Sequence, residues 1–124
     1  MILHLTEGAT WDAWQSAPAD ELLRPASLAT EGFVHCTGDE ATLLRVANTF
    51  YRQLPGELVV LDLDEDTLGS PLVWEHPVPA PPAGSTVTQF PHVYGPIARA
   101  AVQRVRRLVR ATDGTCTGYA DDRA

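Results

Sequence analysis

Long apolar runs are missing from this sequence of 124 residues. The longest extend over a few residues, far short of the ~18 or more that a membrane-spanning helix needs. No basic segment precedes Ile2-Leu3-His4, as it would in a classical secretory signal. We therefore expect no membrane partner and a cytoplasmic location.

The sequence has few cysteines, and it has fewer basic than acidic residues. Only Cys36 and Cys116 are present, the second in a polar C-terminal segment, so a reducing compartment is the simpler interpretation. The net charge of −7 argues against a large surface that follows nucleic-acid phosphates. Five late arginines are the local exception, but such runs are usually solvated faces: Arg99, Arg104, Arg106, Arg107 and Arg110. Nucleic acid is not expected as a partner.

Motifs for metals, nucleophiles and dinucleotides are absent as well. The sequence contains no H-x-H, H-x-x-x-H or C-x-x-C, and the adjacent pair Glu75-His76 would point to opposite faces of a strand. It has no G-x-S-x-G, no P-loop and no G-x-G-x-x-G. We expect no metal, and a metal site could be built only from residues distant in sequence.

The patterns that are present predict one α+β domain over residues 1–110 and a polar, flexible tail over 111–124. Strand-like segments alternate with helical ones; the expected strands are 2–6, 33–37, 58–63, 72–76 and 87–94. Thr10 is expected to cap a helix over 11–17, and Thr37-Gly38-Asp39-Glu40 fits a capping box before a second helix. Residues 102–110 suit either a helix or an edge strand with outward arginines.

Uncommon polar side chains recur on one face of several expected strands. Alternation groups His4 with Thr6, and His35 with Phe33 and Thr37, while Cys36 points to the opposite, core side. It likewise places Glu75 beside Val73, and His92 beside Tyr94. Singly, each of these has a structural explanation. Together they favour a shared cleft, because burying them separately would cost hydrogen bonds.

Two longer strings carry a resemblance to a known family. Residues 31–37 read Glu-Gly-Phe-Val-His-Cys-Thr, Val46-Ala47-Asn48 follows, and residues 90–96 read Phe-Pro-His-Val-Tyr-Gly-Pro. In this order they resemble the bacterial domain of unknown function numbered 952, over nearly the whole chain up to about Leu108. The fold of that family resembles ADP-ribosyltransferases, which implies a mixed β-sheet split into two parts around an NAD cleft, with flanking helices.

The resemblance also implies roles for particular residues. His4-x-Thr6 matches a first-strand pair that anchors NAD, and Glu75 corresponds to a late-strand glutamate that holds the ribose. His35 would be an acid/base group or a ribose contact. Further contacts to the nucleotide would come from Phe33, Thr37, His92 and Tyr94.

Three hypotheses of function follow. The first is an ADP-ribosyltransferase-like enzyme that cleaves the nicotinamide–ribose bond of NAD and transfers the product to an unknown acceptor, with Glu75 and His35 as catalytic residues. The second is a binding module for a nucleotide or small metabolite with the same cleft but no transfer chemistry. The third is a metal-dependent hydrolase built on the histidines.

Overall fold

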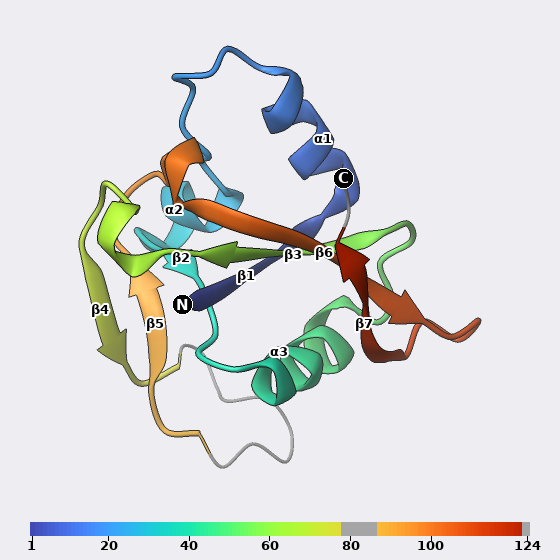
Figure 1. The fold of residues 1–124 in the computed structure, drawn as a ribbon. Coiled ribbons are helices and arrows are strands. Elements are labelled where there is room, and N and C mark those ends of the chain that lie inside the picture. The colour runs from blue at the N-terminus through green and yellow to red at the C-terminus, as the bar shows by residue number, and fades with distance from the viewer. Residues whose placement is uncertain (78–86, 123–124) are drawn as a thin grey trace.

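The computed structural model describes residues 1–77 and 87–122 of the chain (Figure 1). Its strands are β1 (Ile2–Glu7), β2 (Val34–His35), β3 (Leu58–Leu63), β4 (Leu72–Glu75), β5 (Phe90–Val93), β6 (Val102–Arg110) and β7 (Cys116–Asp122). The α-helices are α1 (Gly8–Ser16), α2 (Ala26–Glu31) and α3 (Glu40–Val46), and short helical turns are η1 (Ala47–Tyr51), η2 (Glu65–Thr67) and η3 (Arg99–Ala101). The prediction of a small α+β domain is confirmed.

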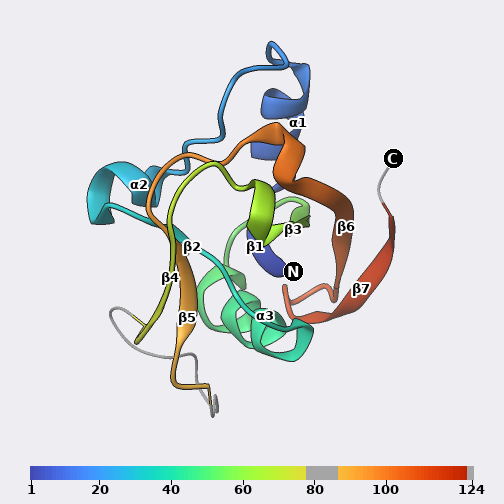
Figure 2. The same ribbon diagram turned by 60° about the vertical axis from the view of Figure 1, so that its left-hand side comes forward.

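The strands form two sheets, in the orders β1-β3-β6-β7 and β2-β5-β4. Figure 2 shows the second sheet standing apart from β6 and β7. The predicted split is therefore present, but "mixed" was wrong, because every strand pair described is antiparallel. A bridge between Leu3 and Thr37 joins the two sheets through two backbone hydrogen bonds of 2.8 Å.

Strand β3 lies inside the larger sheet, between β1 and β6, as its apolar run predicts. All six of its residues are buried. One side of this sheet packs against α1 and the second sheet, and this core includes Ile2, Leu61, Val34 and Cys36. The other side packs against α3, where Leu3, Leu5, Leu43 and Val60 are buried. The two sheets are thus held together by apolar packing on one side of β1, and α3 covers the other.

Both predicted helix caps were wrong in detail. Helix α1 begins at Gly8, so Thr10 lies within it and caps nothing. Helix α3 begins one residue after Asp39, whose carboxylate accepts a 2.8 Å hydrogen bond from the Thr42 backbone N–H. Thr37 cannot take that role, because its backbone is already committed to the bridge with Leu3.

The C-terminal third differs most from the expectation. Residues 102–110 are a strand, and it is not an edge strand, because β7 pairs with its free side. The tail expected to be loose therefore contributes a strand, with Cys116 buried in the core beneath α3. Arg106 points inward, where its guanidinium lies 3.0 Å from the Asp62 carboxylate and also pairs with Glu40. That pairing allows an arginine to occupy a buried position.

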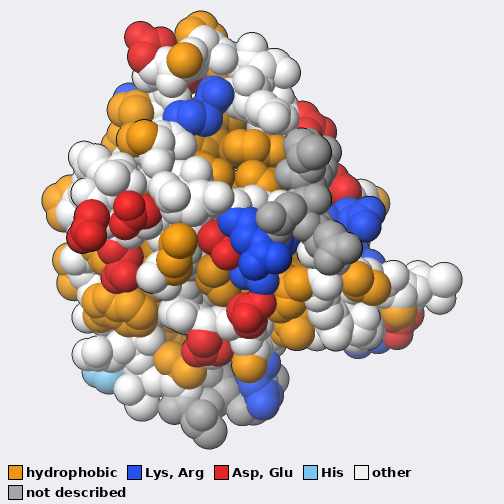
Figure 3. Space-filling view, viewed as in Figure 1, with side chains coloured by type: hydrophobic (Ala, Val, Ile, Leu, Met, Phe, Trp, Pro, Cys, Tyr) orange, Lys and Arg blue, Asp and Glu red, His pale blue; other side chains and the backbone are white. Residues whose placement is uncertain are grey.

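The surface carries charges of both signs. Figure 3 shows acidic side chains interspersed with separate groups of basic ones on the face seen in Figure 1. No helix within residues 1–77 and 87–122 is long and apolar enough to cross a membrane.

Candidate functional site

Most of the predicted site residues meet on one face of the smaller sheet. We call this the histidine face and define it by Phe33, His35, Glu75, His92 and Tyr94. Antiparallel pairing sets His35 opposite His92, and His92 opposite Val73. Alternation then sends Val34 and Val93 to the apolar core on the other side. The structure therefore brings His35, Glu75 and His92 together on one face, with Phe33 and Tyr94 beside them.

The ring of Phe33 contacts the three other rings of the histidine face. Its ring stacks on that of His92 at 4.1 Å between centroids and 21° between planes. His35 meets Phe33 edge-on at 4.8 Å, and Tyr94 lies at 5.5 Å. His92 and Phe33 are buried, whereas the side chains of His35 and Tyr94 are about two-fifths exposed. The exposed pair is therefore the part of the cluster that a ligand could contact.

Glu75 is the most strongly organised charge on this face. One carboxylate oxygen lies 2.7 Å from His92 Nδ1 and also accepts a hydrogen bond from the Tyr94 hydroxyl. These bonds, that from Tyr94 first, lower the pKa of Glu75 below its ordinary value, because they stabilise the charged form. The same contact raises the pKa of Tyr94. Glu75 is thus an ionised, oriented carboxylate, and its side chain is 34% exposed.

A second carboxylate, Glu31, was missed from the sequence. Its Oε2 lies 2.9 Å from His35 Nε2. Glu31 ends α2, and Gly32 follows with φ of 88°, a left-handed conformation that glycine adopts without strain. This turn brings the end of the helix back towards β2. The only signal in the sequence was the Glu-Gly pair before the strand, which marks a helix end rather than a site.

Each histidine of the face therefore has its own carboxylate. The rings of His35 and His92 are 5.5 Å apart, with Glu31 bound to one and Glu75 to the other. Carboxylate partners fix the orientation of an imidazole and identify which nitrogen carries a proton. Two such pairs side by side could hold and move protons on a ligand at the face.

His4 and Thr6 do not belong to this cluster, contrary to the prediction. The bridge aligns Leu3 with Thr37, so alternation puts His4 on the opposite side of β1, with Ile2. His4 is buried, and its Nδ1 donates to the backbone carbonyl of His35 at 2.9 Å. Burial lowers the pKa of His4 below 6.5. It supports the strand that carries His35 rather than presenting a ring to a ligand.

Thr37 keeps its predicted place beside the histidine face. It follows His35 by two positions, is only 5% exposed, and its hydroxyl has no hydrogen-bond partner among the residues that the structure describes. An unpartnered buried hydroxyl is uncommon, because it loses its hydrogen bond to water. Cys36, between them, is buried in the apolar core as predicted, where burial raises the pKa of its thiol.

Ligand sets for a metal are not found in the described part of the chain. No group of three or more His, Cys, Asp or Glu side chains there could hold an ion. His76, the remaining histidine, instead bonds to the Thr88 carbonyl at 3.0 Å.

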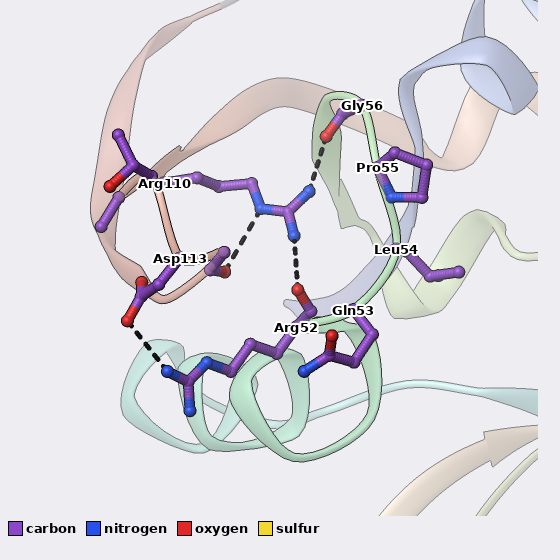
Figure 4. A pocket seen from close by; sticks show the side chains of 10 residues that line it. Arg52, Gln53, Leu54, Pro55, Gly56, Arg110 and Asp113 are labelled. Atoms are coloured by element: carbon purple, nitrogen blue, oxygen red, sulfur yellow. Dashed lines mark hydrogen bonds and ion pairs between the residues drawn. The ribbon is translucent and has the colours of Figure 1, made fainter.

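A hollow of about 380 Å³ lies between two segments that contain no residue of the histidine face, 52–56 and 110–114 (Figure 4). Arg110 occupies its centre, and its guanidinium donates to backbone carbonyls, among them those of Gly56 and Arg52. Arg52 pairs with Asp113 at 2.9 Å. These charges are committed to joining the β6–β7 turn to the segment before β3. The hollow is therefore a structural junction, and we do not assign it a ligand.

Comparisons with known proteins agree with the fold. The crystal structure of protein CC0527 from Caulobacter crescentus is similar to this chain, with 26% identity and a TM-score of 0.70. The similarity covers 94% of this chain and 92% of that protein, and a double mutant of CC0527 matches equally well at 25% identity. No curated protein matches the chain. Residues 8–105 match the family described as protein of unknown function DUF952, and the chain belongs to that family.

Proposed function

We propose that the histidine face binds NAD or a related nucleotide and cleaves its nicotinamide–ribose bond, transferring the ribosyl group to an acceptor. The observation that carries the proposal is Glu75, a carboxylate held ionised by His92 and Tyr94 and still one-third exposed. The split of the sheet into two parts, which the resemblance to ADP-ribosyltransferases implies, adds support.

The chemistry needs a fixed negative charge. As the bond to nicotinamide breaks, its electron pair leaves with the neutral base and positive charge develops on the ribose. A preorganised carboxylate stabilises that oxocarbenium-like state, as in glycoside cleavage. Glu75 is oriented by two donors before any ligand arrives, so it needs little reorganisation. His35, with Glu31 on its Nε2, would accept the proton of the attacking hydroxyl.

The roles proposed for the remaining residues change with the geometry. His4 is buried and bonds to the backbone of His35, so it would act through β2, and the buried Thr6 is not assigned as a direct anchor of NAD. Phe33 and His92 form a rigid base beneath the exposed rings. Thr37 is 5% exposed, so a ribose could reach its unpartnered hydroxyl only if neighbouring residues moved.

A binding module without transfer chemistry is the second candidate. It is favoured by the burial of His4 and Thr6, the expected anchors, and by the bond of His4 to the backbone of His35. Such a module would keep the rings and carboxylates for recognition alone. A ligand that raises the melting temperature without being consumed would identify it.

The test follows nicotinamide released from millimolar NAD by the intact protein and by Glu75→Gln. The proposal expects release by the intact protein and a loss of about 10²-fold or more in the variant, typical of removing one electrostatic contact to a transition state. Glu21→Gln is the matched control, since Glu21 is an exposed glutamate outside the cluster. Neither binding nor release with the intact protein would overturn the proposal.

A further inference from the structure

The histidine face carries two carboxylates. Glu31 and Glu75 both present partly exposed carboxylates there, at 36% and 34%. The elements that build the face, α2, β2, β4 and β5, contain no lysine or arginine. A phosphate-binding surface is built from such cations or from helix N-termini, whereas Glu31 lies at a helix C-terminus.

The two exposed rings of the histidine face also favour a positively charged ligand. His35 and Tyr94 flank the buried Phe33, and each is joined to one of the two carboxylates by a hydrogen bond. Aromatic faces attract cations through the negative charge above the ring, and an adjacent carboxylate strengthens the attraction. Aromatic groups with anionic neighbours are the usual receptors for organic cations that cannot donate hydrogen bonds.

We propose that the histidine face selects an organic cation, with its positive charge seated against His35 and Tyr94 between Glu31 and Glu75. Suitable ligands are a ring bearing an alkylated nitrogen or a quaternary ammonium group. The inference rests on the site of the proposed function and specifies the part of the ligand that the site recognises.

Matched probes that differ in charge test the proposal. N1-methylnicotinamide and nicotinamide share a ring but only the first is a cation, and choline and 3,3-dimethylbutanol form the corresponding aliphatic pair. Binding to the full chain is measured by titration calorimetry at about pH 8. We expect at least one cation to bind about five-fold or more tightly than its neutral partner. The pair that shows the difference identifies the ring or the ammonium as the source of the charge.

Two variants locate the binding. Glu31→Gln and Glu75→Gln should each reduce the preference for the cation, and their combination should abolish it. Glu31 is exposed, so its variant remains informative if Glu75→Gln is unstable, and Glu21→Gln should leave the preference unchanged.

Three results would overturn the inference: equal affinity for a cation and its neutral partner in both pairs, a preference that survives the double variant, or tighter binding of ADP-ribose than of either cation. Release of nicotinamide from NAD is measured separately. Cation preference without release leaves this inference standing and removes the proposed function, whereas release without cation preference does the reverse.

Discussion

At the scale of single residues, His4 shows how a buried side chain can serve a site without touching it. Its ring donates to the carbonyl of His35, the residue that faces the ligand side of β2. Donating from Nδ1 to a carbonyl fixes the neutral tautomer, and burial lowers the pKa of the ring. The folded chain therefore favours the neutral form of His4.

The preference of the folded chain for neutral His4 predicts that stability depends on pH. In the unfolded chain His4 takes up a proton near its ordinary pKa of 6.5, but in the folded chain its pKa is lower. The stabilisation from neutral His4 is full above pH 6.5 and is lost as the pH falls towards the folded pKa. The free energy of unfolding, measured with urea between about pH 7.5 and 5.5, should fall less steeply in His4→Asn, which keeps a donor at the same place.

His76→Asn is the control, because His76 is exposed and also bonds to a carbonyl through Nδ1. The free energy of unfolding of His76→Asn should change with pH as steeply as that of the intact protein. A His4→Asn variant whose stability changes with pH as steeply as that of the intact protein would contradict the assignment.

Alternation along strands predicted much of the site. Phe33, His35, Glu75, His92 and Tyr94 meet because β2, β4 and β5 pair side by side, and each strand was recognisable from its sequence. His4 was placed wrongly because alternation fixes faces within a strand but not the register between strands. A shift of one residue at the Leu3–Thr37 bridge would have put His4 on the histidine face.

At the scale of elements, the start of α3 matters because it follows directly on the strand of His35. Asp39 accepts from the backbone N–H and the hydroxyl of Thr42, at 2.8 and 2.9 Å. These bonds satisfy a donor that the first helical turn leaves free. The capping box starting at Thr37 predicted the cap two residues too early, and the backbone of Thr37 is instead bonded to Leu3 of β1.

Asp39→Ala should therefore lower the free energy of unfolding by about 1 kcal/mol. Asp39→Ser keeps an oxygen that can accept the same bond, so it should recover most of the loss. Chemical denaturation of the three proteins measures both effects. If Asp39→Ala is as stable as the intact protein, the cap at Asp39 is not the one that supports α3.

At the scale of the whole molecule, the C-terminal strand closes the larger sheet. Strand β7 pairs with β6, and Asn48 fixes it by two hydrogen bonds to the backbone of Cys116, at 3.0 and 2.7 Å. Tyr119 packs over Arg106 at 4.5 Å and donates to the carbonyl of Glu40. No pattern in residues 111–124 predicted this strand, since its stability comes from distant partners and not from an apolar pattern of its own.

Removing residues 112–124 should leave the protein unfolded or strongly destabilised. The truncation would expose the core beneath α3, turn β6 into an edge strand and leave Asn48 without its partners. Thermal unfolding followed by circular dichroism measures the change, with Thr117→Ala as an exposed control in the same strand. If the truncated chain has the same melting temperature as the intact one, this segment is a dispensable tail.

We expect a ligand to bind at the histidine face and not at the hollow around Arg110. Mapping backbone amide shifts by NMR while NAD is added tests this most directly. We expect the shifts to concentrate at Glu31, His35, Glu75 and Tyr94, with little change near Arg52 and Arg110. Shifts centred on the Arg110 junction, or none at millimolar NAD, would contradict it.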